Sequence, residues 1–138
     1  MAEYPDKTDF ELVSPERLLV SESVDMVVVP GGEGDFGVLP GHTPMISTIR
    51  PGVIDVHDGG SVTRRIFISG GFAEVMPDRC TVLAEEAMPL EDVDRSDADA
   101  RLKRAREEVE DALDEAERGA AEARLAVAEA LVSHLGQG

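Results

Sequence analysis

Residues 32–37, with the sequence GEGDFG, come closest in residue type and spacing to a motif that could do chemistry. They match G-x-G-x-x-G, in which glycines let the backbone approach a pyrophosphate at the start of a helix. Pro40 and Gly41 follow too soon for a helix to begin there. Glu33 and Asp35 would also repel a pyrophosphate. We therefore interpret the segment as a glycine-rich loop that presents two carboxylates.

The other residues that commonly do chemistry form no recognisable site in the sequence. His42, His57 and His134 lie in different segments without the spacing of zinc ligands. No serine lies in a G-x-S-x-G motif, and the phosphate-binding pattern G-x-x-x-x-G-K-[ST] does not occur. Cys80 lies in the apolar run 80–84 and is expected to be a small buried hydrophobe. We expect no catalytic residues, no metal site and no cofactor.

The composition narrows the classes of partner. The 138 residues include 13 basic and 29 acidic side chains, so the net charge is −16. Such a chain has few cations to replace the counterions of nucleic acid or of an anionic membrane surface, and a basic protein partner fits better. Residues 1–10 are charged and resemble no signal peptide, and no apolar run is long enough to span a bilayer. We expect a soluble, cytosolic protein without direct membrane insertion.

The first part of the chain is predicted to be all β. Short β-prone segments alternate with glycine, proline and aspartate turns as far as about residue 90, which is typical of a sandwich or barrel. Asp58-Gly59 and Pro77-Asp78 are expected hairpin turns. The predicted strands are 8–13, 17–24, 25–29, 45–49, 52–57, 62–69, 71–76 and 79–84.

The remaining residues are predicted to form two helices. Apolar residues, many of them alanine, recur every three or four positions over 96–118 and again over 120–135. Ser96 is the expected N-cap of the first helix, and Gly119 its expected stop. An antiparallel hairpin with an alanine-rich seam buries little area, so it should be loosely stable and movable.

Three parts of the chain are therefore predicted, each with its own role. Residues 1–88 would form a domain that docks onto a larger partner. Residues 89–95 would be a hinge, and residues 96–138 would contain the helical hairpin. This layout indicates a binding protein rather than an enzyme.

Five segments together resemble the epsilon subunit of F-type ATP synthases over essentially the whole chain. They are 13–16 (VSPE), 34–44 (GDFGVLPGHTP), 51–52 (PG), 69–75 (SGGFAEV) and 81–84 (TVLA). The resemblance implies a ten-stranded β-sandwich followed by a helical hairpin. It further implies a non-catalytic rotor subunit of the central stalk, peripheral at the cytoplasmic face of the bacterial inner membrane. Such a subunit couples proton flow through the c-ring to ATP synthesis performed elsewhere.

The same resemblance implies the partners and the residues that meet them. The acidic member of the signature loop faces polar c-ring loops that typically carry an arginine, which places Glu33 and Asp35 at the c-ring. The region next to it is expected near the gamma subunit. The implied gamma contacts are His42, Met45, Ile46 and Ser47.

The helical part departs from the family pattern for ATP binding. Some members bind ATP through an [IL]-D-x-x-R-A segment at the first helix. The matching positions here are Val93, Asp94, Asp97 and Ala98. Asp97 stands where the arginine belongs, and an anion beside a phosphate reverses the sign of the interaction. We predict weak or no ATP binding, although Arg95, Arg101 and Arg104 are cations close by.

The hairpin also departs from the pattern of inhibitory members, in which basic residues of the second helix transiently contact the alpha and beta subunits. Residues 120–135 contain a single Lys or Arg, Arg124. Residues 91–138 hold seven basic and fourteen acidic side chains, a net charge of −7. We predict that inhibition by this hairpin is weak, because an acidic target would repel it.

Three alternatives remain open at the level of sequence. A ligand-sensing regulator would fold its hairpin around ATP, and it would need the missing cation at position 97. An enzyme that used the glycine-rich loop would need a helix after Gly37. A generic β-sandwich scaffold fits the composition but leaves the signature segments unexplained.

Overall fold

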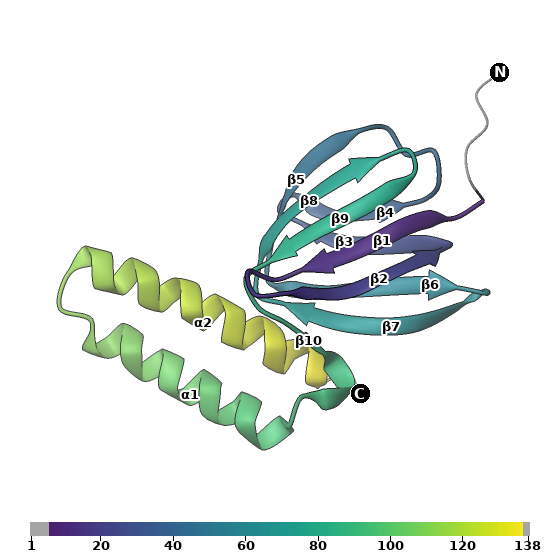
Figure 1. Ribbon diagram of the computed structural model, residues 1–138. Helices are drawn as coiled ribbons and strands as arrows, with labels where there is room; N and C mark the ends of the chain where they lie inside the picture. Colours follow the sequence, from purple (N-terminus) through teal and green to yellow (C-terminus); the bar gives the residue numbers. More distant parts are fainter. Residues whose placement is uncertain (1–5, 137–138) are drawn as a thin grey trace. The chain divides into compact units, whose positions relative to one another are not determined.

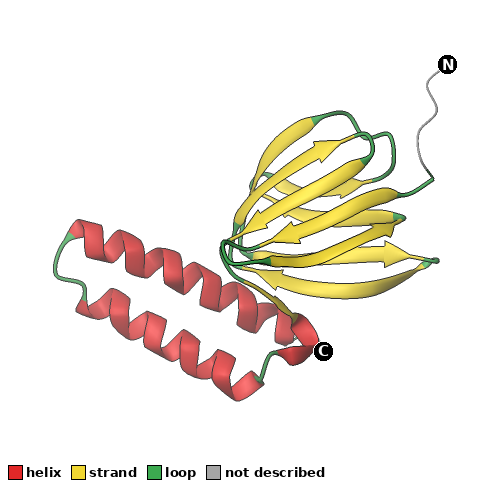
Figure 2. Cartoon of the chain, in the orientation of Figure 1, coloured by secondary structure: helices red, strands yellow, loops and turns green. Residues whose placement is uncertain are grey.

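The computed structural model describes residues 6–136 and divides into two compact units, Met1–Pro89 and Leu90–Gly138. We refer to them as the β-unit and the helical hairpin and describe each separately. Figure 2 shows that the strands belong to the first unit and the helices to the second. The first five residues of the predicted docking domain and the last two of the predicted hairpin lie outside the described residues.

The described part of the β-unit, residues 6–89, contains ten strands, as the family resemblance implied (Figure 1). They are β1 (Thr8–Val13), β2 (Leu18–Val24), β3 (Met26–Gly31), β4 (Gly34–Val38), β5 (Met45–Ile49), β6 (Gly52–Asp58), β7 (Ser61–Ile68), β8 (Gly71–Met76), β9 (Arg79–Ala84) and β10 (Ala87–Pro89). The strand order is β10-β7-β6-β3-β5-β8-β9-β1-β2, with β4 paired to β3. All pairs are antiparallel except β1 with β9.

Most strands of the sandwich alternate between buried and exposed side chains, so one face of the sheet lines the core. In β1, for example, Thr8, Phe10 and Leu12 are buried, whereas Asp9 and Glu11 are on the other face. Fully buried Val, Ile, Leu and Phe side chains from both layers form one core, and each contributes about 1.5–3 kcal/mol relative to exposure. The candidate site lies on turns and outer faces that are anchored to this core.

Two strands were not predicted from the sequence. Residues 34–38 form β4 rather than part of a glycine-rich loop, because Val38 is buried in the core and Phe36 packs against it. The loop therefore shrinks to a turn at residues 32–33. Pro89, predicted as the first hinge residue, ends β10, which pairs with β7. A proline is tolerated there because β10 is an edge strand.

The helical hairpin begins with a short 3₁₀ helix, η1 (Leu90–Asp92), followed by α1 (Arg95–Asp111) and α2 (Glu115–Leu135). The predicted extent of the first helix, 96–118, is wrong at its end, and the turn lies at residues 112–114. Gly119 lies inside α2 and does not have a positive φ angle.

The turn lies where it does because Asp114 and Glu117 form a reciprocal cap. The Asp114 side chain accepts a hydrogen bond from the Glu117 backbone N–H at 2.7 Å. The Glu117 side chain in turn accepts one from the Leu113 N–H at 2.9 Å. These two hydrogen bonds satisfy two backbone donors at the start of α2, which stabilises the chain more than ending the first helix at Gly119 would. The N-cap of α1 is likewise Asp94, which accepts from the Asp97 N–H at 3.0 Å, rather than the predicted Ser96.

The seam of the hairpin is rich in alanine, as the periodicity indicated. Four buried alanines are distributed over the two helices: Ala98, Ala105, Ala121 and Ala128. Arg124 on α2 and Glu108 on α1 form an ion pair at 3.2 Å. Alanine buries little apolar area, so the hairpin has less packing energy per residue than the β-unit. Among the described residues, no helix is long and apolar enough to cross a membrane.

Candidate functional site

The β3–β4 hairpin, residues 26–38, presents Glu33 and Asp35. Its strands are in register from Val27 opposite Val38 to Gly31 opposite Gly34, so residues 32–33 form a two-residue turn. A side chain at position 32 would place its Cβ 2.5 Å from Thr48 Oγ1, because the turn lies directly against β5. Glycine at position 32 permits this close approach, and the hydrogen bond from the Gly32 N–H to the Thr48 carbonyl at 2.9 Å ties the turn to β5.

Asp35 lies on β4 and forms an ion pair within the chain. Arg50, immediately after β5, donates from Nη2 to Asp35 Oδ1 at 2.5 Å and from Nη1 to the Gly31 carbonyl at 2.6 Å. Both charged side chains remain accessible, with 62% of Asp35 and 44% of Arg50 exposed. Arg50 was not among the site residues identified from the sequence. The available signal was that it is the only Lys or Arg between Arg17 and Arg64.

Glu33 differs from Asp35 in having no ionic partner. It occupies the turn and is exposed, and no ion pair or side-chain hydrogen bond involves it within residues 6–136. The structure therefore brings both predicted carboxylates to one hairpin but gives them different surroundings. Asp35 is neutralised locally, whereas Glu33 is a free negative charge.

The residues expected near gamma occupy the loop after β4 and the start of β5. Ile46 is 74% exposed, and Met45 beside it is partly exposed. Ser47 points the other way, since its register partner Ala73 is buried. The His42 ring nitrogen Nδ1 contacts the Thr43 carbonyl at 2.7 Å. Of these four residues, Ile46 offers the clearest contact surface.

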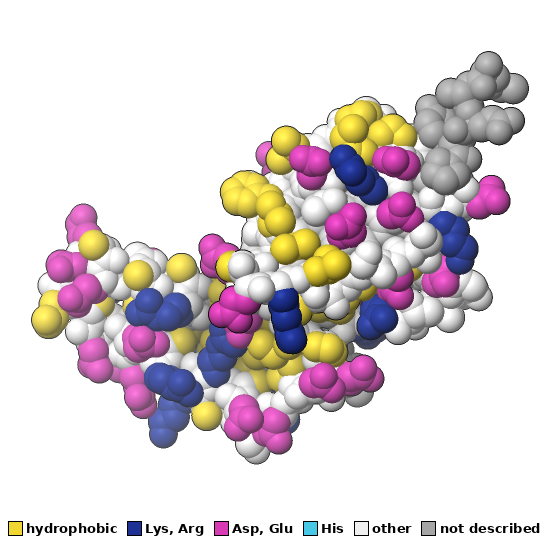
Figure 3. Space-filling model, viewed as in Figure 1, with side chains coloured by type: hydrophobic (Ala, Val, Ile, Leu, Met, Phe, Trp, Pro, Cys, Tyr) yellow, Lys and Arg dark blue, Asp and Glu magenta, His cyan; other side chains and the backbone are white. Residues whose placement is uncertain are grey.

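An exposed apolar row, missed from the sequence, crosses the same outer face. Its members lie in register on four neighbouring strands, with Phe72 opposite Leu83, Leu83 opposite Val13, and Val13 opposite Leu18. Phe72 and Leu83 are each 54% exposed. In Figure 3, hydrophobic side chains form a diagonal line across the β-unit. We call the four residues Phe72, Leu83, Val13 and Leu18 the apolar row.

Two carboxylates border the apolar row on the same face. Glu74 lies two residues beyond Phe72 on β8 and is opposite Ile46 of β5. Glu11 lies two residues before Val13 on β1. The face thus combines an apolar strip with a negatively charged margin. That combination suits a partner surface with apolar residues flanked by Lys or Arg.

The four degenerate ATP-site positions come together at the start of α1. Asp94 caps the helix through the Asp97 N–H, and Ala98 is buried in the seam. Both carboxylates, those of Asp94 and Asp97, are exposed. Two negative charges therefore lie at the N-terminus of α1. The Asp94 carboxylate already interacts favourably with the helix dipole, as a bound anion would.

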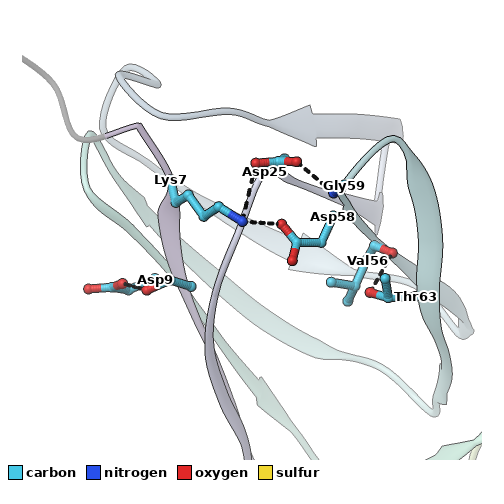
Figure 4. A network of polar contacts seen from close by, with 8 residues as sticks. Lys7, Asp9, Asp25, Val56, Asp58, Gly59 and Thr63 are labelled. Atoms are coloured by element: carbon cyan, nitrogen blue, oxygen red, sulfur yellow. Dashed lines mark hydrogen bonds and ion pairs between the residues drawn. The ribbon is translucent and has the colours of Figure 1, made fainter.

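Figure 4 shows another group of charged residues on the β-unit, in which the charges pair with one another. Lys7 Nζ lies 2.5 Å from Asp58 Oδ1 and 3.6 Å from Asp25 Oδ1, and Asp25 accepts from the Gly59 N–H at 2.9 Å. The hydrogen bond between Lys7 and Asp58 raises the pKa of Lys7 and lowers that of Asp58. The cluster joins the start of β1 to the turns at the ends of β2 and β6. Among the described residues, no three His, Cys, Asp or Glu side chains are placed to hold a metal.

Comparisons with known proteins give the family. A family profile described as "ATP synthase, Delta/Epsilon chain, beta-sandwich domain" matches residues 7–90. The ATP synthase epsilon chain of Rhodospirillum rubrum is 56% identical over 128 residues, which cover 93% of this chain and 96% of the relative. That of Maricaulis maris is 55% identical over 126 residues, covering 91% and 94%.

Solved structures agree with these relatives. A chain of the Euglena gracilis mitochondrial ATP synthase, in an assembly of OSCP, F1 and c-ring, gives a TM-score of 0.84 at 30% identity. The match covers 97% of this chain and 84% of that one. A chain of the Tetrahymena thermophila mitochondrial ATP synthase, in a structure of the central stalk and c-ring, shares the fold with a TM-score of 0.68 at 14% identity. This second match covers 93% of this chain and 96% of that chain. The chain belongs to the family of ATP synthase epsilon chains.

Proposed function

We propose that this chain is a rotor subunit of the central stalk, held by the gamma subunit and resting on the c-ring. As an epsilon chain it is a subunit of ATP synthase and not a catalyst in its own right. Its task is to transmit c-ring rotation, driven by proton flow, to the subunits that make ATP. The observation that carries the proposal is one rigid β-unit that presents both an apolar row and an acidic hairpin.

The apolar row and Ile46 are the proposed gamma-binding surface. Large exposed side chains aligned across neighbouring strands are costly to leave in water and gain most when a partner covers them. Phe72 is the best candidate for the central anchor, because aromatic residues dominate the energy of most interfaces. Glu74 and Glu11 would set the orientation by pairing with basic residues at the margin, each contributing little by itself.

The β3–β4 hairpin is the proposed c-ring contact. Its turn carries the Glu33 carboxylate, and exposed ion pairs are worth only about 0.2–1 kcal/mol each. Affinity for the rotor should therefore come mainly from the apolar row, and the hairpin should fix the position of the subunit on the ring. The chain would be peripheral to the membrane, at its cytoplasmic face in a bacterium.

We further propose that the helical hairpin is movable about residues 90–94, between β10 and α1, but regulates weakly. Its net charge of −7 over residues 91–138 opposes approach to acidic surfaces of the alpha and beta subunits. Asp97 and the capping role of Asp94 oppose ATP binding at α1. A chain ending at Leu90 should leave the ATP hydrolysis rate of the assembled enzyme nearly unchanged, and a several-fold rise would refute weak inhibition.

Gamma binding is tested by the single variant Phe72→Asp in the full-length chain. A charge in the middle of the apolar row should weaken co-purification with gamma and the c-ring by at least tenfold, as expected for an interface anchor. Val62→Asp is the matched control, because Val62 is also exposed but lies on β7, outside the row. Unchanged binding of Phe72→Asp, with a native circular dichroism spectrum, would exclude this face as the gamma surface.

A further inference from the structure

We propose that Arg50 is a positioning residue that neutralises Asp35, so that Glu33 is the carboxylate that meets a cation of the c-ring. This inference rests on the proposed c-ring contact and changes which residue makes it. The family resemblance gave the main role to the acidic residue at position 35. The contacts of Arg50 favour Glu33 instead.

Arg50 is held at three points, which makes its position well defined. Its backbone N–H donates to the Pro30 carbonyl at 3.0 Å, and Nη1 donates to the Gly31 carbonyl at 2.6 Å. The third bond, from Nη2 to Asp35, is charge-assisted. A planar guanidinium carries donors on separate nitrogens in a fixed geometry, so it satisfies both side-chain bonds at once.

The arginine side chain also spans β3. On one edge of β3, Pro30 pairs with Asp35 of β4. On the other edge, Gly31 pairs with Ile49 of β5, and Gly32 donates to the Thr48 carbonyl at 2.9 Å. Arg50 follows Ile49 directly, so its side chain reaches across β3 to a carboxylate on the far strand. This bond ties β4, which has no second neighbouring strand, to the body of the sandwich.

The result is an asymmetric charge on the hairpin. Asp35 and Arg50 cancel, and the remaining charge of −1 lies at Glu33 in the turn. A cation arriving from the c-ring would meet Glu33 without competition. To bind Asp35 it would have to compete with a guanidinium that is already ordered, and that guanidinium would repel it.

The test measures binding of the full-length chain, together with gamma, to the detergent-solubilised c-ring. Glu33→Gln should weaken binding by a factor of about 1.4 to 5, the range for one exposed ion pair. Asp35→Asn should also weaken it, because Arg50 is left as an unpaired cation beside the ring. The double variant Asp35→Asn/Arg50→Gln should recover most of the binding lost in Asp35→Asn, because it removes a pair that is neutral overall. Glu110→Gln, an equal charge change at an exposed residue of α1, is the control and should have no effect.

The outcomes separate this inference from the proposed function. If the double variant binds as weakly as Asp35→Asn, then Asp35 meets the ring directly, and the inference is wrong while the c-ring contact stands. If no variant differs from the control, the c-ring contact itself is refuted.

A second measurement checks the clamp without any partner. In the free chain, ¹⁵N NMR should show separate Nη1 and Nη2 resonances for Arg50, since rotation of its guanidinium is restrained. The two should merge in Asp35→Asn and persist in Glu33→Gln. Merged resonances in the wild type would show that Arg50 is not clamped and would overturn the inference.

Discussion

Replacing Gly119 with alanine tests the position of the turn between the two helices. Gly119 lies in the first part of α2, is exposed, and does not have a positive φ angle. A Cβ added there meets no atom within 4 Å. An alanine should therefore gain the full helix propensity difference, about 0.8–1.0 kcal/mol. At 1.36 kcal/mol per tenfold change, this lowers the equilibrium constant for opening of α2 roughly four- to fivefold, and amide exchange slows by the same factor.

Amide hydrogen exchange of α2, followed by NMR in the intact chain, measures this change directly. Ala120→Gly is the matched control, because Ala120 is the adjacent exposed residue of the same helix, and it should accelerate exchange by a similar factor. The double variant Gly119→Ala/Ala120→Gly moves the glycine by one residue and should be nearly neutral. If Gly119→Ala destabilised α2, then position 119 would have a left-handed backbone, and the turn would lie where the sequence alone places it.

Two further predictions concern the core of the β-unit. Thr8 is fully buried, and its Oγ1 has no hydrogen-bond partner, so Thr8→Val should raise the free energy of unfolding by about 1 kcal/mol. Urea unfolding measures this, with the exposed Thr63→Val as control, and a loss of stability would mean that the Thr8 hydroxyl is hydrogen-bonded in solution. Burial raises the pKa of Cys80 from 9.0 to about 12. Above pH 9 the unfolded thiol loses its proton while the folded thiol keeps it, so stability falls from pH 9 towards pH 12. Relative to Cys80→Ala, the wild type should lose about 2 kcal/mol between pH 8 and 10.5, and an unchanged difference would contradict the burial of this thiol.

The sandwich could be predicted in large part because its strands carry their own signals. β1, β5, β8 and β9 have the bounds expected from the sequence, since each combines β-prone residues with a turn at both ends. β4 was missed because three glycines in residues 32–37 outweighed the alternation of Phe36 and Val38. Glycine lowers the intrinsic preference for a strand, but here β3 and the core supply the energy that the segment lacks.

The helix boundaries also could not be predicted from local sequence signals alone. Gly119 and Ser96 are good local signals for a helix end and a helix start. The structure uses Asp114 and Asp94 instead, because each makes a cap that is also compatible with the pairing of the two helices. Several residues compete for each cap, and only the packing of the hairpin decides among them.

The candidate site shows why residue types alone do not decide which carboxylate of a segment is left to meet a partner. The sequence placed Glu33 and Asp35 together, and their types predicted a basic partner. It could not show that Arg50, fifteen residues after Asp35, reaches across β3 and supplies a cation from within the chain. That contact depends on the order of β4, β3 and β5 in the sheet, which no local pattern encodes. A carboxylate in a signature motif is therefore free to meet a partner only if the fold leaves it unpaired, and in this fold that residue is Glu33.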